Sequence, residues 1–240
     1  MNQMRTLILI AVMALPAFVS ANDDCQPRKI MATYSIEEIT KDQTSHNRNE
    51  LILLRTQNSA FHISNKTVAT QWTKLPKNNM KKTSYFIDDK RAIEYEATKT
   101  NTNQAWDHHA QLLHPKFTEQ ATLIEKTGEG CEKLEHYQQK EKTKTVDIWW
   151  FPEEKIMKRM TSVSADKTIN WQLTEATHNQ KVIQQQLDIL SSYQSTDFAD
   201  IGDNESDPFF RKMINLGFIE HSASGFYDSK GNSLPSSHQH

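Results

Sequence analysis

Alternation of apolar and polar residues is the main pattern in the middle of the chain, and this period of two predicts β-strands. It is clearest over 144–176, where Val146, Ile148 and Trp150 occupy every second position. Short polar stretches around Pro152 and Asp166 interrupt the alternation. We therefore expect three antiparallel strands joined by tight turns.

Further strand signals precede this segment. Leu51–Leu54 is a continuous apolar run typical of a buried strand. Two hairpins are predicted over 60–72 and 83–97, and another pair of strands over 121–138. Residues 22–48 are polar and mixed, and no strand is assigned there; their apolar points are Ile30, Met31, Tyr34, Ile36 and Ile39.

Apolar residues at helical spacing predict three short helices, over 104–113, 182–190 and 208–216. The third has the clearest ends, because Asp207 is a good N-cap, Pro208 suits the first helical position and Gly217 suits a left-handed cap. Together these elements predict an α+β fold that is mainly β. We expect a twisted antiparallel meander sheet or half-barrel packed by two or three short helices.

The N-terminus has the three parts of a secretory signal peptide: Arg5, an apolar run over 7–15 and small residues up to Ala21. We predict cleavage after residue 21, a single β-rich domain over 22–228 and a flexible tail over 229–240. The protein would then be periplasmic or secreted. No later run of apolar residues is long enough to span a bilayer, so no transmembrane segment is expected in the mature chain.

Cys25 and Cys131 are the two cysteines of the predicted mature chain. An even pair in an oxidising compartment predicts one disulfide. The alternative is a reactive thiol, but no Cys-x-x-Cys motif is present to support it.

Composition excludes several classes of function. The 28 Lys and Arg residues balance 30 Asp and Glu residues, and this net charge of −2 argues against a nucleic acid partner. No glycine precedes Gly128, so the first half has no glycine-rich phosphate loop. Motifs for serine hydrolases, zinc peptidases and haem attachment are absent too. We expect a non-catalytic protein without a cofactor; the alternative is a hydrolase whose residues assemble from distant positions.

An acidic run over 197–207 is the most unusual local feature. Asp200, Asp203 and Glu205 are candidate calcium ligands, because closely spaced carboxylates suit a hard cation. The EF-hand pattern is incomplete, since the required glycine and the final glutamate are missing. The alternative is that Asp207 caps the following helix while the other acids face solvent.

Histidines gather at His108, His109 and His114. His109 and His114 are five residues apart, so they do not form the i, i+4 pair that binds zinc on a helix. Surface histidines are the preferred interpretation.

Adjacent tryptophans are the remaining candidates. Trp149 and Trp150 neighbour each other on a predicted strand, so they face opposite sides of the sheet. A curved sheet could hold an apolar ligand on one of these sides, and the candidate residues are Trp149, Trp150, Phe151 and Trp171. The alternative is that a helix covers this face and buries the rings.

The signal peptide, the antiparallel meander, the few helices and the size of the chain resemble the LolA-type periplasmic carriers. That family has an unclosed β-barrel with a helical lid. The resemblance covers 45–195 and departs at 197–228. It implies binding of a lipid-like or other apolar ligand, and no functional residue is carried over from it.

Two functional hypotheses follow. The first is an exported binding or accessory protein for an apolar small molecule. The second is a protein-interaction module of an envelope or redox complex, which presents the helix 208–216 to its partner. Phe209 and Phe210 discriminate between them, because burial of both rings would make that helix part of the core.

Overall fold

The computed structural model describes residues 25, 28–42, 46–100, 103–204 and 206–215. The predicted signal peptide over 1–21, the predicted tail over 229–240 and Gly217 lie outside these ranges.

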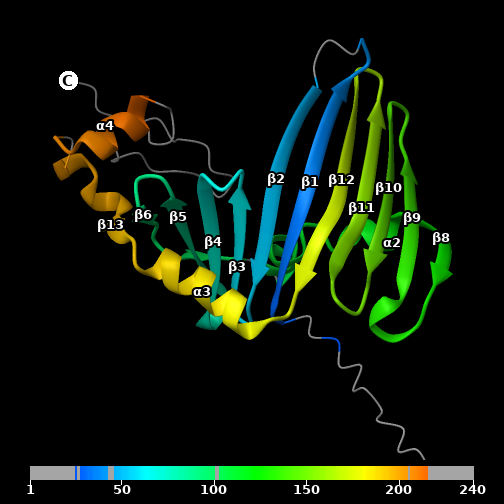
Figure 1. The fold of residues 1–240 in the computed structure, drawn as a ribbon, viewed down its shortest axis with the longest axis horizontal. Helices are drawn as coiled ribbons and strands as arrows, with labels where there is room; N and C mark the ends of the chain where they lie inside the picture. The colour runs from blue at the N-terminus through cyan, green and yellow to red at the C-terminus, as the bar shows by residue number, and fades with distance from the viewer. Residues whose placement is uncertain (1–24, 26–27, 43–45, 101–102, 205, 216–240) are drawn as a thin grey trace, which may run out of the picture.

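Within these ranges, thirteen strands form one large sheet (Figure 1). The strands of its first half are β1 (Ile30–Thr40), β2 (His46–Arg55), β3 (Ser59–Ser64), β4 (Val68–Leu75), β5 (Asn79–Phe86), β6 (Arg91–Glu94) and β7 (Thr98–Lys99). Those of its second half are β8 (Thr122–Thr127), β9 (Leu134–Lys140), β10 (Lys144–Phe151), β11 (Ile156–Ser164), β12 (Lys167–Thr177) and β13 (Gln194–Asp197).

The order of the strands explains why the sheet stays open. It runs β13-β6-β5-β4-β3-β2-β1-β12-β11-β10-β9-β8, with β7 paired to β5 outside this path. The two ends, β13 and β8, do not pair with each other. The mainly β half-barrel predicted from the sequence is therefore confirmed. The predicted meander is interrupted where β1 pairs with the distant β12, and β13 pairs with β6 in parallel rather than antiparallel.

Strand β1 was not predicted, although it joins the two halves by pairing with β2 and β12. Its inward residues Ile30, Ala32 and Tyr34 are fully buried and occupy alternate positions. Met31 beside Ile30 and the acidic pair Glu37–Glu38 obscure this alternation in the sequence. The absence of a strand from 22–48 was thus wrong, and the missed strand is a central one.

The three predicted helices are confirmed as α1 (Asn103–Gln111), α3 (Gln180–Ser191) and α4 (Pro208–Asn215). A further short helix, α2 (Lys116–Gln120), follows Pro115. Single 3₁₀ turns complete the set: η1 (Pro76–Asn78), η2 (Gly130–Glu132), η3 (Phe198–Asp200) and η4 (Gly202–Asn204). Among the described helices, none combines the length and apolar character needed to cross a membrane.

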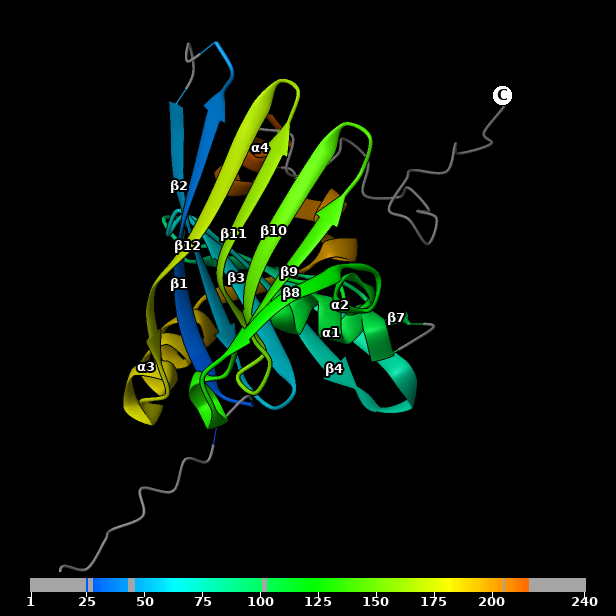
Figure 2. The same ribbon diagram turned by 90° about the vertical axis from the view of Figure 1, so that its right-hand side faces the viewer.

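Helices cover the sheet on both sides. Helix α3 crosses one face, and α1 and α2 lie against the other, as the two views in Figures 1 and 2 show. We call the face carrying α1 and α2 the inner face and the face under α3 the outer face. Leu53 of β2 points into the inner cluster around Tyr34, whereas its neighbour Leu54 packs with Ile183 of α3. Both faces of β2 are therefore buried, which explains its continuous apolar run.

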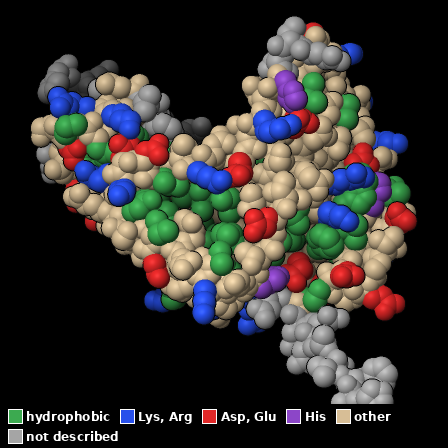
Figure 3. Space-filling model, viewed as in Figure 1, with side chains coloured by type: hydrophobic (Ala, Val, Ile, Leu, Met, Phe, Trp, Pro, Cys, Tyr) green, Lys and Arg blue, Asp and Glu red, His purple; other side chains and the backbone are tan. Residues whose placement is uncertain are grey.

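Part of α3 remains exposed. Its outward residues Val182 and Ile189 are solvent-accessible. Figure 3 views this side of the molecule and shows apolar side chains interspersed with charged ones. Such scattered exposure is normal on a protein surface and does not by itself indicate a binding site.

Helix α4 is anchored to the β5–β6 end of the sheet. The Asp207 carboxylate caps it by accepting a hydrogen bond from the Phe209 N–H at 2.8 Å, and it also pairs with Arg91 at 3.0 Å. The Arg91 guanidinium lies over the rings of Phe209 and Phe210. Both rings are buried with Phe86 and Ile93. The helix thus belongs to the core, which weakens the hypothesis that it presents these rings to a partner.

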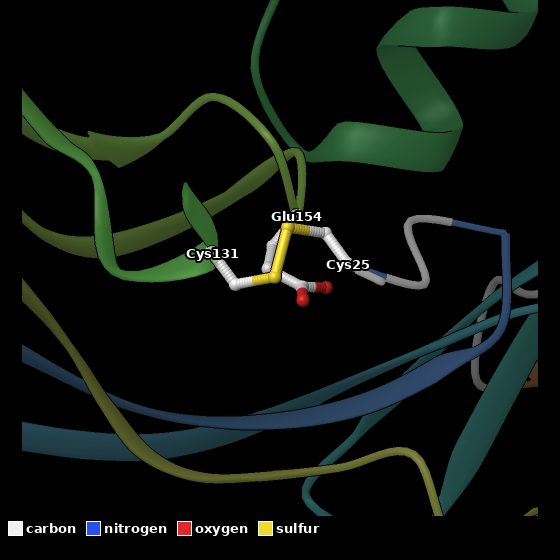
Figure 4. A group of neighbouring side chains, drawn as sticks. All are labelled: Cys25, Cys131 and Glu154. Carbon is white, nitrogen blue, oxygen red and sulfur yellow. A yellow bond between two sulfur atoms is a disulfide. The ribbon is translucent and has the colours of Figure 1, made fainter. Parts of the chain in front are cut away.

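The predicted disulfide is confirmed between Cys25 and Cys131, 106 residues apart. It fastens the segment before β1 to η2, just ahead of β9. The carboxylate of Glu154, from the turn between β10 and β11, lies beside the two sulfur atoms (Figure 4).

We predict that Phe210→Ala lowers the free energy of unfolding by about 3–5 kcal/mol, because it opens a cavity at a ring that is 1% exposed. Chemical denaturation measures this loss. The matched control is Ile189→Ala on α3, which is 51% exposed and should cost about 0.5 kcal/mol. Equal losses in the two variants would contradict the placement of α4 in the core.

Candidate functional site

Strand register aligns six side chains into one row across the inner face. The pairs Ile36–Trp171, Trp171–Met160, Met160–Ile148, Ile148–Tyr137 and Tyr137–Leu123 are each directly opposite on neighbouring strands, from β1 to β8. All six are apolar or aromatic. We call this set the apolar row: Ile36, Trp171, Met160, Ile148, Tyr137 and Leu123.

The apolar row is only partly covered. Ile148 is buried, whereas Leu123 is 40% exposed and the other four members are half-buried. Because directly opposed side chains in a sheet touch, the row forms one continuous strip rather than isolated residues. The inner face therefore presents apolar surface that the described part of the chain does not fully bury.

The segment containing α1 and α2 covers the lower part of this face. Leu112, Leu113 and Phe117 pack into the same cluster as Tyr34 and Trp150. Leu112 has a positive φ of 59°, where the chain turns between the helices. This left-handed conformation costs energy for a leucine, so packing of the apolar side chains must hold the turn in place.

We call the segment over 103–120, which contains α1 and α2, the cover. Arg55 at the end of β2 holds it in place. Its guanidinium donates hydrogen bonds to the carbonyl oxygens of Ala110 at 2.7 Å, Lys155 at 2.9 Å and Glu154 at 2.6 Å. The side chain is 3% exposed, and this burial lowers the pKa of Arg55 to about 10. Arg55 therefore remains charged at neutral pH and joins α1 to the turn between β10 and β11. The only signal for this role in the sequence is an arginine at the end of an apolar strand.

Three of the four predicted ligand residues come together. Trp150 lies in the inner cluster, and Trp171 and Phe151 pack against it. Trp149 lies on the outer face, as its adjacency to Trp150 implies. Its ring stacks on His136 at 4.0 Å, and the Arg159 guanidinium lies 3.5 Å from its centroid.

Of the three histidines expected at the surface, His108 and His114 are exposed, whereas His109 is half-buried by packing. His109 stacks on Trp72 at 4.0 Å, and His62 donates a hydrogen bond to the His109 carbonyl oxygen at 2.7 Å. Burial, together with nearby His62 and His108, lowers the pKa of His109 to about 4. Neutral histidine rings thus help to hold α1 against β3 and β4.

No metal centre is evident in the described part of the chain. The only set of three ligating groups close together there is Cys25, Cys131 and Glu154, and its two sulfurs are bonded to each other. Of the predicted calcium ligands, Asp200 is exposed and Glu205 lies outside the described residues. The calcium site at Asp200, Asp203 and Glu205 therefore stays a prediction.

Comparison with known proteins gives matches among solved structures alone. No protein-family profile and no curated protein matches this chain. Two crystal forms of PNGF-II match with TM-scores of 0.37 and 0.39, at 7% and 9% identity. They cover 70% and 83% of this chain but only 31% and 36% of PNGF-II, so the chain spans about a third of that protein.

Two smaller proteins match over most of their length. The LolA superfamily protein NE2245 from Nitrosomonas europaea has a TM-score of 0.30 and 8% identity, covering 65% of this chain and 89% of its own. A DUF1329 family protein from Desulfovibrio piger has a TM-score of 0.29 and 3% identity, covering 64% and 86%. The superfamily that the sequence resembles is thus among the matches, and the likeness is one of fold alone.

Neutral His109 makes stability depend on pH. Its pKa of about 4 in the fold lies below the ordinary value near 6.5, so the unfolded chain binds the proton more readily. We predict that the free energy of unfolding is highest above pH 6.5 and falls as the pH drops towards 4. Denaturant midpoints across this range measure the effect. His109→Phe, which can still stack, should flatten the profile, and the exposed His114→Gln should not. Equal profiles for His109→Phe and the wild type would contradict this role.

Arg55→Lys is predicted to loosen the cover, because one ammonium group cannot satisfy three separated carbonyl oxygens. We expect a loss of about 3 kcal/mol in unfolding free energy and faster amide hydrogen exchange over 103–120. The control is Arg48→Lys on the same strand, whose exposed pair with Glu37 at 3.2 Å should change stability by less than about 1 kcal/mol. Unaltered exchange over 103–120 in Arg55→Lys would show that packing alone holds the cover.

Proposed function

We propose that this protein is an exported, non-catalytic carrier that holds an apolar, lipid-like ligand on the inner face of its half-barrel. The observation that carries this proposal is the apolar row, which crosses six strands and is only partly covered. Strands are spaced by ~4.8 Å, so the row extends for about 24 Å, a length suited to an elongated apolar molecule.

Trp150 and Phe151 are the proposed contact residues beside the apolar row, and Trp171 is one within it. They belong to the same inner cluster, which the cover formed by α1 and α2 partly overlies. Trp149 is left out, because its ring is engaged by His136 and Arg159 on the outer face. A ligand on this face would replace water at half-buried apolar side chains, and that exchange supplies its binding energy.

Location outside the cytosol is part of the proposal. A disulfide between Cys25 and Cys131 persists in oxidising compartments and is rare in reducing ones. Together with the predicted signal peptide, it supports a periplasmic or secreted protein. An envelope protein that delivers or receives the ligand is the partner this function would require.

Binding of N-phenyl-1-naphthylamine, a neutral dye that fluoresces in apolar surroundings, tests the proposed site. We expect saturable binding by the wild type and at least tenfold weaker binding by Met160→Glu, because a carboxylate in the apolar row must be desolvated. Val163→Glu is the matched control. It lies on the same strand, is 45% exposed and is not part of the row, so its affinity should equal that of the wild type.

A loss of fold in Met160→Glu must be separated from a loss of binding. Melting temperature serves for this, and Met160→Leu, which conserves volume, should retain both fold and affinity. Equal affinity in Met160→Glu and the wild type, or no saturable binding by the wild type, would refute the proposed function.

A further inference from the structure

A cavity of about 300 Å³ beside the cover concentrates positive charge. Three cations line it: Arg28 from the segment before β1, Arg55 from β2 and Lys155 from the turn before β11. Asp107 of α1 is the one carboxylate in its lining. Within the described residues, neither Arg28 nor Lys155 forms an ion pair with a carboxylate. The lining therefore carries a net positive charge that no ion pair of Arg28 or Lys155 offsets among the described residues.

Arg55 strengthens this imbalance because its charge is buried. Its terminal nitrogens bond to backbone carbonyls, which solvate a cation without neutralising it, and its Nε has no hydrogen-bond partner among the described residues. The Glu154 carboxylate acts on it only through space and lies instead 3.2 Å from His178. A cation in low-dielectric surroundings attracts an anion more strongly than an exposed one does.

A second cavity, of about 180 Å³, adjoins the first, and four of its eight lining residues are apolar. Gln111 and Lys155 line both of them. Around the second lie apolar side chains that include Trp150 of the inner cluster: Leu113, Pro115, Trp150 and Pro152. At the edge of the cover, the cationic cavity is thus continuous with one whose wall is partly apolar.

We infer from this juxtaposition that the ligand is an anionic amphiphile. Its oxyanion headgroup, a carboxylate or a phosphate, would occupy the cavity lined by Arg28, Arg55 and Lys155. Its apolar chain would lie along Trp150 and Leu113 towards the inner face. This inference rests on the proposed function and adds to it the chemistry of the headgroup.

The disulfide supports this assignment, because Arg28 lies three residues after Cys25. The bond to Cys131 ties the start of the segment that carries Arg28 to the body of the protein. This bond limits how far Cys25 can move from the body of the protein, so less backbone ordering is needed near Arg28 when an anion binds.

Three twelve-carbon compounds distinguish the contribution of the headgroup to affinity from that of the chain: dodecyl phosphate, dodecanoate and neutral 1-dodecanol. Displacement of N-phenyl-1-naphthylamine gives their affinities, and calorimetry gives that of inorganic phosphate. We expect both anions to bind at least tenfold more tightly than dodecanol, and 0.5 M sodium chloride to narrow this gap. Inorganic phosphate alone should bind far more weakly than dodecyl phosphate.

Two variants test whether this cavity causes the preference for anions over dodecanol. Lys155→Met should lower the ratio of anion affinity to dodecanol affinity severalfold, whereas Lys158→Met, on the same hairpin but outside both linings, should leave this ratio unchanged. Asp107→Asn should increase the affinity for both anions, a gain that misfolding cannot produce.

The outcomes distinguish this inference from the proposed function. Equal affinities for dodecanol and the two anions would refute the anionic headgroup but leave the carrier function intact. Equal affinities for inorganic phosphate and dodecyl phosphate would show a simple anion site and refute the amphiphile. Failure of all three amphiphiles to displace the dye would refute the apolar site itself, and this inference with it.

Discussion

The buried guanidinium of Arg55 connects segments that lie far apart in the chain. A cation removed from water must be solvated by the protein, and the carbonyl oxygens of Ala110, Glu154 and Lys155 provide this solvation. Helix α1 and the turn between β10 and β11 are therefore obliged to meet at the end of β2. This requirement sets the cover over the lower inner face and leaves the apolar row beyond it partly open.

The charged and apolar groups of the candidate site also meet near Arg55. The disulfide draws the segment before β1 to η2, so that Arg28 joins Arg55 and Lys155 around one cavity. Apolar side chains begin immediately beside it, at Leu113 and Trp150. Charge is thus gathered at one edge of the cover and apolar surface on the face behind it, the arrangement that an amphiphile with an anionic headgroup would match.

Helices and strands could be predicted where the local sequence pattern was clear. Strands β10 to β12 alternate cleanly and have marked turns, and α4 has an N-cap at Asp207, so all were predicted. Strand β1 was missed because Met31 and the acidic pair Glu37–Glu38 disturb its alternation. Trp149 was grouped with Trp150 as a ligand residue, although adjacent strand residues point to opposite faces, and only one of them reaches the inner cluster.

The sequence by itself determined the class of fold, the pairing of its two cysteines and the positions of α1, α3 and α4, because these depend on local periodicity, capping and chemistry. Strand order, register and the meeting of Arg28, Arg55 and Lys155 were decided by the tertiary structure. Local sequence patterns indicate which residues of a strand are buried, but they do not indicate which other strand pairs with it. The apolar row exists only because six strands from both halves of the chain pair in one particular register.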